Sequence, residues 1–411
     1  MKQTRPFPKA RVTRKAEISI KNGHPWVYED EITSTEGELP NGCIVDVYSP
    51  KDSWLGAGLL SLHSKIRIRI LSSNANETFS GQFWIRRVGY ALDLRRSVMG
   101  EYYPSCCRLI FGEADGLPGL TVDCFGDLLV SEVLSYGIDM RKDQIYRALK
   151  ERLSLDGVNI RGIWERNTSS LREKEGLETF SGWYAGDLFP EDCGSALTEI
   201  TENGIRYAVD VENGQKTGFF LDQKYNRLRI QQLARGRRVL DCFTHTGSFA
   251  MNAAAGGAEK VTAVDISSFA IESARQNLVL NGLEGRVETV CADVFELLNE
   301  KLRDRSDRYD MIILDPPAFT KSRSTVDSAS RGYKQINMAA MRLLPRGGIL
   351  ATCSCSHFMT ESLFEKMLAS AARDAGVSVK ILEKRQQAPD HPVLLGVDET
   401  SYLKFYILQI V

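Results

Sequence analysis

Short apolar runs alternate with segments of helical length through the second half of this 411-residue chain, and this alternation limits the fold more than any other feature of the sequence. The runs of strand length lie at residues 239–242, 261–265, 287–292, 311–314 and 349–352. Strict alternation of this kind is typical of a parallel, doubly wound α/β sheet. Two further runs, at 377–382 and 403–410, have no long helix between them, which predicts an antiparallel pair at one edge.

The end of the first run carries the first sign of a ligand site. Asp241 closes this run, and Phe243 leads into a turn of small residues at Thr246, Gly247 and Ser248. Small residues let the backbone approach a ligand closely where the next helix begins. The spacing is not the G-x-G-x-x-G of dinucleotide-binding sheets. A single turn of this kind is common in α/β proteins and does not by itself indicate a ligand.

Acidic residues at the next three strand ends strengthen the prediction. Ligands of parallel sheets bind at the carboxyl ends of the strands, where an acid such as Asp265 can accept hydrogen bonds from two ribose hydroxyls. Asp293 follows the third run and is placed to receive an adenine amino group. Asp315 closes the fourth run, and Pro316 and Pro317 make a rigid rim beside it. Core packing does not explain four such strand ends in succession.

These strand ends resemble the motifs of the class I S-adenosylmethionine-dependent methyltransferases. Residues 241–247 match the first motif of that class, Asp265 its ribose-binding acid and Asp293 its adenine contact. Asp315 with its two prolines matches the fourth motif. The resemblance implies a Rossmann-like methyltransferase domain with S-adenosyl-L-methionine as its cofactor.

Two cysteines at the end of the fifth run suggest which atom is methylated. Carbon 5 of cytosine is a poor nucleophile, but a thiolate that adds to carbon 6 activates it toward an electrophilic methyl group. That chemistry needs a cysteine at a strand end, and Cys353 and Cys355 both lie close to one. Their spacing does not decide between them, and two inert buried cysteines are the plain alternative.

Further segments resemble the large-subunit rRNA cytosine-5 methyltransferases of the RlmI type. These segments are residues 213–223 with Arg227, and residues 331–334, 354–356 and 390–392. The resemblance covers essentially the whole chain and implies that Cys355 is the nucleophile and that the partner is 23S rRNA or an assembly intermediate. The residues that would then border the cofactor pocket are Phe220, Asp222, Gln223 and Arg227. Which nucleotide is modified, and whether the protein acts as a homodimer, stays open.

One residue separates this chain from a neighbouring family. The other large group of RNA cytosine-5 methyltransferases places a second cysteine directly after the prolines of the fourth motif, where this chain has Ala318. A release step that uses a cysteine in the fourth motif is therefore excluded. Asp315 is our candidate for holding the flipped base or assisting proton transfer, and Phe319 and Tyr333 are candidates for stacking on that base.

The first half of the chain has a different organisation. Residues 1–75 contain short strands separated by turns, which predicts a small β-barrel. The resemblance identifies this barrel as a PUA domain that binds RNA, and implies a central α+β linking domain at 76–190 and the methyltransferase domain at 191–411.

A basic strip in the barrel is the candidate RNA contact. Lys65, Arg67 and Arg69 alternate with isoleucines, so a strand would place the three cations on one face. That face is either a solvated sheet surface or a strip that contacts RNA phosphates. Basic residues near the N-terminus, Arg5, Arg11 and Arg14, are further candidates.

Composition limits the remaining classes of function. The nine cysteines and five histidines do not follow the spacing of a metal site, so we expect no metal and reduced thiols. No apolar run is long enough for a membrane span, and residues 1–15 lack the apolar stretch of a secretory signal, which favours a cytoplasmic protein. Two other functions stay open: a nitrogen-directed RNA methyltransferase, such as a guanine-N7 enzyme, and a non-catalytic RNA-binding protein.

Overall fold

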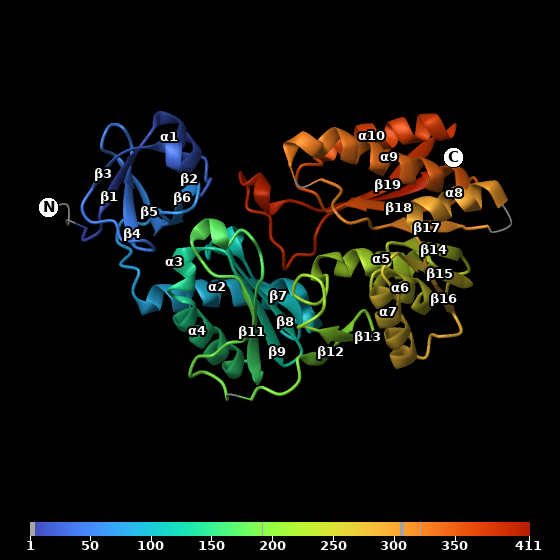
Figure 1. The fold of residues 1–411 in the computed structure, drawn as a ribbon, viewed down its shortest axis with the longest axis horizontal. Coiled ribbons are helices and arrows are strands. Elements are labelled where there is room, and N and C mark those ends of the chain that lie inside the picture. The colour runs from blue at the N-terminus through green and yellow to red at the C-terminus, as the bar shows by residue number, and fades with distance from the viewer. Residues whose placement is uncertain (1–4, 191, 305–307, 321) are drawn as a thin grey trace. The chain divides into compact units, whose positions relative to one another are not determined.

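The computed structural model describes residues 5–190, 192–304, 308–320 and 322–411, and Figure 1 shows its helices and strands. Contacts between residues divide the chain into two compact units. The first unit contains Met1–Ile200, Val209–Leu221 and Pro389–Thr400. The second unit contains Thr201–Ala208, Asp222–Ala388 and Ser401–Val411.

A six-stranded sheet forms the N-terminal part of the first unit. Its strands are β1 (Lys9–Val12), β2 (Trp26–Tyr28), β3 (Ile32–Glu36), β4 (Ile44–Tyr48), β5 (Trp54–Leu60) and β6 (Ile66–Ser72), in the order β2-β6-β5-β4-β1-β3. Helix α1 (Arg14–Lys21) begins after Thr13, whose hydroxyl accepts a hydrogen bond from the Ala16 amide. Val12, Val45 and Ile68 lie in the buried core.

The basic strip on β6 differs from the prediction. Arg69 is only 7% exposed, and its guanidinium pairs at 2.7 Å with the buried carboxylate of Glu175. Arg67 is largely buried and pairs with Glu29, whereas Lys65 is exposed. The burial of Arg69 and its pairing with a carboxylate 106 residues away argue against a contact with RNA phosphates, and that contact stays a prediction.

The N-terminal arginines also form ion pairs with carboxylates. Arg5 pairs with the buried Asp46, Arg11 pairs with Asp52, and Arg14 pairs with Glu17 on α1. The RNA contacts predicted for these arginines stay predictions, and each would require its side chain to exchange a carboxylate for a phosphate.

A five-stranded sheet forms the rest of the first unit, together with α2 (Gly81–Met99), α3 (Tyr136–Asp139) and α4 (Lys142–Leu155). Its strands are β7 (Cys106–Phe111), β8 (Leu120–Phe125), β9 (Leu128–Val133), β10 (Gly162–Asn167) and β11 (Phe180–Trp183), in the order β11-β10-β9-β8-β7. Helices α2 and α4 pack against each other. Only β9 and β10 are parallel, so this part is of mixed α+β type.

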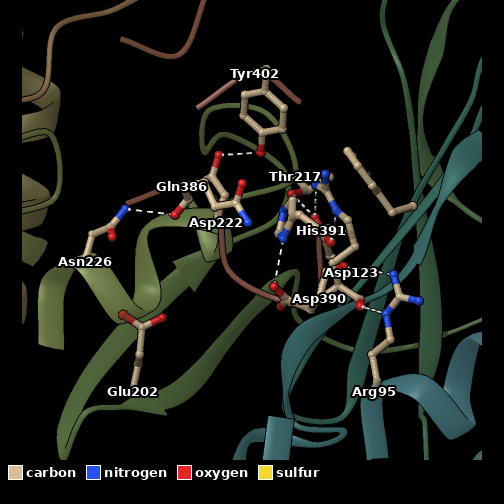
Figure 2. Close-up of polar contacts among 12 residues, drawn as sticks. Arg95, Asp123, Glu202, Thr217, Asp222, Asn226, Gln386, Asp390, His391 and Tyr402 are labelled. Carbon is tan, nitrogen blue, oxygen red and sulfur yellow. Dashed lines mark hydrogen bonds and ion pairs between the residues drawn. The ribbon is translucent and has the colours of Figure 1, made fainter. Parts of the chain in front are cut away.

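A segment near the C-terminus is built into the core of the first unit. Arg95 on α2 donates to the carbonyl of Asp390 at 2.8 Å, and the amide of Arg108 donates to the Asp390 carboxylate at 3.0 Å. The other Asp390 oxygen lies 2.8 Å from Nδ1 of His391, and both residues are buried (Figure 2). These contacts explain why residues 389–400 belong to the first unit.

The segment Val209–Leu221 belongs to the first unit for a similar reason. The hydroxyl of Thr217 donates at 2.5 Å to the buried Asp123 carboxylate on β8 (Figure 2). Arg108 binds the same carboxylate with two nitrogens, at 2.7 and 2.8 Å. The compact units therefore differ from a continuous domain over residues 191–411, and the three-domain division stays a prediction.

A seven-stranded sheet dominates the second unit and confirms the predicted α/β fold. Its strands are β14 (Arg238–Cys242), β15 (Lys260–Asp265), β16 (Val287–Cys291), β17 (Met311–Leu314), β18 (Ile349–Ser354), β19 (Val379–Arg385) and β20 (Lys404–Ile410). The order is β16-β15-β14-β17-β18-β20-β19. All pairs are parallel except those of β20, which runs antiparallel to both neighbours as predicted.

Helices cover both faces of this sheet, which explains its uninterrupted apolar strands. The helices are α5 (Lys224–Leu233), α6 (Ser248–Ala255), α7 (Ser268–Asn281), α8 (Val294–Asp304), α9 (Val326–Leu343) and α10 (Glu361–Ala375). Ile312, Leu350 and Phe364 lie in one fully buried cluster. Strands β12 (Leu197–Glu202) and β13 (Ile205–Asp210) form a separate two-stranded sheet. In the part of the chain that the structure describes, no helix combines the length and apolarity needed to cross a membrane.

The burial of Arg69 yields a prediction about stability. Arg69→Met leaves the Glu175 carboxylate buried without its cation, which should lower the free energy of unfolding by roughly 3 kcal/mol or more. Chemical denaturation followed by tryptophan fluorescence measures this loss. The exposed Lys65→Met is the control and should stay close to the native stability. Equal stability of the two variants would contradict the structural role of Arg69.

Candidate active site

Four strand ends meet at one edge of the large sheet. The ladder pairs Cys242 with Val264 on β15 and with Leu314 on β17, and it pairs Leu314 with Thr352 on β18. Because these strands are parallel and in register, the residues that follow them lie along the same carboxyl edge. The acids predicted to form a site therefore do end their strands at one edge.

Asp241 organises the loop between β14 and α6. It is fully buried, and its Oδ2 accepts hydrogen bonds from the Thr244 hydroxyl and from the amide of Ala250 at 2.9 Å. The loop contains three left-handed residues, Phe243, His245 and Gly247, with φ of 63°, 50° and 80°. A side chain at Gly247 would approach the Ala274 methyl group to 3.1 Å, so glycine suits both the backbone and the packing there.

The second oxygen of Asp241 is a buried acceptor at this edge of the sheet. Its Oδ1 atom is buried and, among the described residues, has no hydrogen-bond partner. Burial raises the pKa of this carboxyl to about 7, and the nearby Asp315 and Asp265 act in the same direction. A buried acceptor of this kind is costly unless a donor or a cation satisfies it.

Asp265 and Asp293 hold the neighbouring loops. Asp265 accepts hydrogen bonds from the amide of His245 at 3.0 Å and of Ser267 at 2.9 Å, which ties the end of β15 to the Asp241 loop. Asp293 accepts from the amides of Phe295 at 2.8 Å and Glu296 at 3.1 Å, so one of its oxygens caps α8. The roles predicted for Asp265 at a ribose and for Asp293 at an adenine stay predictions.

Asp315, Cys353 and Gln223 form a polar cluster at the next strand ends. The Cys353 thiol donates to Asp315 Oδ1 at 2.8 Å and lies 3.4 Å from the Leu314 carbonyl. The Gln223 amide donates to the same carboxylate at 3.3 Å and to the Cys353 sulfur at 3.5 Å. Burial raises the pKa of Asp315 to about 6 and holds the pKa of the Cys353 thiol well above its ordinary value. Cys353 is therefore a protonated hydrogen-bond donor.

Cys355 lies just beyond the end of β18 and differs from Cys353. Strand β18 ends at Ser354, and Cys355 is partly exposed where Cys353 is completely buried. Hydrogen bonds fix the residues on either side. The Ser354 hydroxyl donates to the Tyr333 hydroxyl at 3.0 Å, and the Ser356 carbonyl accepts from Lys404 Nζ at 2.6 Å.

Three of the four residues predicted to border the cofactor pocket, Asp222, Gln223 and Arg227, interact with Asp315, but two of them also have other partners. Arg227 is buried and binds both carboxylate oxygens of Glu202, at 2.6 and 2.9 Å. Asp222 is also buried and accepts from the Tyr402 hydroxyl at 2.6 Å (Figure 2). Phe220 belongs to the first unit. Arg227 thus forms an internal ion pair. The cofactor contacts of Phe220, Asp222 and Arg227 stay predictions.

The two aromatic candidates for stacking also differ. Tyr333 is completely buried, so the prediction that it stacks on an entering base is wrong. Phe319 is partly buried, and its ring lies 4.6 Å from that of Tyr333 and 6.5 Å from that of Phe243. Lys404 was not among the residues predicted from the sequence. Its only signal is a lone cation at the start of an otherwise apolar strand.

Comparison with protein families adds an independent line of evidence. A family model described as S-adenosylmethionine-dependent methyltransferase matches residues 182–409, which is more than half of the chain. A second model, described as a PUA-like domain, matches residues 10–73. The second match confirms the PUA-like nature predicted for the N-terminal barrel.

Known relatives match along nearly the full length. The protein named ribosomal RNA large subunit methyltransferase I from Pseudoalteromonas atlantica is 42% identical over 395 residues, which are 96% of this chain and 97% of its own. The protein of the same name from Klebsiella pneumoniae is 40% identical over 405 residues, 98% of each chain. Among solved structures, a putative S-adenosylmethionine-dependent methyltransferase from Streptococcus mutans is 25% identical with a TM-score of 0.79, over 98% of this chain and 99% of that one.

The sheet, its strand-end acids and the family match define this protein as an S-adenosylmethionine-dependent methyltransferase with an N-terminal PUA-like domain. The cofactor predicted from the sequence is thereby confirmed, and a similar putative methyltransferase, 25% identical with a TM-score of 0.80, is described as complexed with SAH. The chain belongs to the family of ribosomal RNA large subunit methyltransferase I.

The residues at the sheet edge fit this cofactor. S-adenosyl-L-methionine carries an ammonium group, a sulfonium and ribose hydroxyls, so it offers both donors and positive charge. The Oδ1 atom of Asp241, which has no hydrogen-bond partner among the described residues, would be satisfied by a hydrogen-bond donor or by a positive charge. In the described residues no group of three potential metal ligands comes together.

Asp241 predicts how stability depends on pH. Its folded-state pKa of about 7 exceeds the ordinary value of 3.8, so between these pH values the folded chain keeps a proton that the unfolded chain has released. The free energy of unfolding should therefore fall as pH rises from 4 to 7, by about 1.4 kcal/mol for each unit of pKa difference at most. Asp241→Asn should flatten this fall. Denaturation of the cofactor-free protein at pH 5 and pH 8 measures it, with the exposed Asp327→Asn as control. An unchanged slope would count against the buried carboxyl.

Asp265 predicts cofactor affinity. If its carboxylate holds the ribose, Asp265→Ala should weaken binding of S-adenosyl-L-methionine by about tenfold to a hundredfold, since hydrogen bonds to charged groups contribute roughly 1.5–3 kcal/mol. Isothermal titration calorimetry measures this affinity. Asp327→Ala on α9 is the matched control and should bind normally. Normal affinity in Asp265→Ala would rule out the ribose assignment.

Proposed function

We propose that the protein transfers a methyl group from S-adenosyl-L-methionine to carbon 5 of a cytosine in 23S ribosomal RNA, with Cys355 as the covalent nucleophile. The observation that carries the proposal is the difference between the two thiols at the end of β18. Cys353 is buried and donates to Asp315, whereas Cys355 is partly exposed at the carboxyl edge of the sheet.

The position of Cys355 suits addition to a pyrimidine ring. Its thiolate would form a bond to carbon 6 of the cytosine and give carbon 5 the electron density to take up a methyl group. When bound, the cofactor supplies this methyl group and leaves as S-adenosylhomocysteine. A base then removes the proton from carbon 5, the bond between sulfur and carbon 6 breaks, and the thiolate of Cys355 returns.

Asp315 is the candidate for the polar contacts of the target base. Burial raises its pKa to about 6, so at neutral pH it is largely ionised but a stronger base than an exposed aspartate. Hydrogen bonds from Cys353 and Gln223 hold one of its oxygens in place. Asp315 is therefore suited to accept a hydrogen bond from the cytosine amino group or the proton from carbon 5.

Two observations support ribosomal RNA as the partner. Relatives about 40% identical over nearly the whole chain carry the name ribosomal RNA large subunit methyltransferase I. The chain also has a PUA-like domain in addition to the methyltransferase domain, and Lys65, directly before β6, is exposed. Ribosomal RNA as the substrate agrees with the cytoplasmic location expected from the sequence.

The nucleophile assignment gives a direct prediction. Cys355→Ala should bind S-adenosyl-L-methionine normally and lose methyl transfer, by at least about a thousandfold, because no thiolate is left to add to carbon 6. Transfer of labelled methyl groups to 23S rRNA measures this loss. Cys353→Ala, two residues away, is the comparison and should lose much less activity, because it removes only one of the two hydrogen bonds donated to Asp315. Full activity in Cys355→Ala would eliminate the covalent mechanism.

A mechanism-based trap separates the proposal from a nitrogen-directed methyltransferase. In RNA that carries 5-fluorocytosine the group on carbon 5 cannot leave as a proton, so the bond to Cys355 should persist. The expected product is a protein–RNA adduct that survives denaturation and is absent in Cys355→Ala. Methylation of normal RNA without any such adduct would favour transfer to a nitrogen.

A further inference from the structure

Lys404 is a buried cation at the start of an apolar strand. It opens β20, whose following residues are mostly buried, and is itself only 9% exposed. Lysine is almost never buried without a partner or a role. The ladder pairs Lys404 with Ser354, the last residue of β18, so its position is fixed by the sheet.

The ammonium group of Lys404 binds the backbone around Cys355. Its Nζ atom donates to the carbonyl of Ser356 at 2.6 Å and to that of Tyr402 at 2.8 Å. Ser354 and Ser356 flank Cys355, and Lys404 contacts the first through the ladder and the second through Nζ. Lys404 therefore contacts the residues on both sides of Cys355.

Lys404 is surrounded by titratable groups that favour its positive charge. Burial lowers the pKa of Lys404 to about 8, while Cys355, Cys353 and Glu361 favour its charged form. Among the described residues the Lys404 ammonium forms no ion pair with a carboxylate, and its two hydrogen-bond acceptors are backbone carbonyls. Tyr333 on α9 is another titratable group that interacts with Cys355. Lys404 is thus a cation in the immediate surroundings of this thiol.

We propose that Lys404 is the positioning residue of Cys355, which fixes the loop after β18 through the Ser356 carbonyl and stabilises the thiolate of Cys355 with its positive charge. The proposal rests on the function proposed above, because it concerns the same nucleophile. A thiolate is the reactive form of cysteine, and a neighbouring cation makes that form more populated at neutral pH.

Lys404 is suited to this role because its own proton is weakly held. Below about pH 8 the ammonium is charged and stabilises the thiolate. Above that pH the ammonium loses its charge and with it the attraction for the thiolate. The benefit of Lys404 is therefore confined to pH values near and below neutrality.

The test is the reactivity of Cys355 in the full chain without cofactor or RNA. Iodoacetamide alkylation is followed for each cysteine by mass spectrometry of peptides between pH 6 and pH 10. The exposed Cys291 serves as an internal reference in the same sample. Lys404→Met should move the Cys355 profile to higher pH by about one unit, which means about tenfold slower alkylation at neutral pH. The profile of Cys291 should not move.

Two further variants separate charge from packing. Lys404→Arg keeps the cation and should retain most of the Cys355 reactivity at neutral pH. Lys384→Met removes a lysine from the adjacent strand β19, where it pairs with Glu361 and Glu365, and should leave the Cys355 profile unchanged. If Lys404→Met does not fold, Lys404→Gln keeps a donor for the Ser356 carbonyl without the charge and gives the same comparison.

The outcomes distinguish this proposal from the function it rests on. A Cys355 profile in Lys404→Met or Lys404→Gln that coincides with the native one overturns the role of Lys404, whatever the activity of Cys355→Ala. A shifted profile supports it even if Cys355→Ala still methylates RNA, which would overturn only the covalent mechanism. With both proposals correct, Lys404→Met lowers kcat about tenfold at pH 7, leaves the affinity for S-adenosyl-L-methionine unchanged and regains activity as pH rises.

Discussion

The register of the parallel strands is the constraint on which the site depends. Cys242 lies opposite Val264 on one side and Leu314 on the other, so Asp241, Asp265 and Asp315 come at the ends of neighbouring strands. A shift of one residue in either ladder would turn these side chains to the opposite face of the sheet. The buried Asp241 then links the sheet to the loop before α6, and Asp265 ties that loop to the end of β15.

The fold of the second unit could be predicted because its signal is local. Each strand is a short apolar run and each acid lies at or directly after the end of its run, so the periodicity of the sequence and the rule for strand ends are sufficient. The long-range contacts gave no such signal. Arg69 pairs with Glu175 across 106 residues, and Arg95 binds Asp390 across 295 residues. Alternation identifies the face of a strand but not the side chain that packs against it.

The candidate site was predictable in type but not in the role of each residue. The sequence pointed to an acid at Asp293, yet the helix cap that this acid provides is seen only in the backbone of α8. Arg227 matched a family segment, but its bidentate contact with the buried Glu202 makes it part of an internal ion pair. Lys404 carried almost no signal, because a lysine at the start of a strand is usually a solvated end.

The two cysteines illustrate what three-dimensional structure adds to a motif. They are two residues apart, and on a continuing strand they would share a face and an environment. The strand ends at Ser354, and the environments separate. Cys353 meets the Asp315 carboxylate, which together with burial keeps its proton in place. Cys355 lies between two residues contacted by Lys404, whose positive charge favours loss of the proton. One strand end thus gives two chemically identical thiols different environments, in which one donates a hydrogen bond and the other is, in our proposal, the nucleophile.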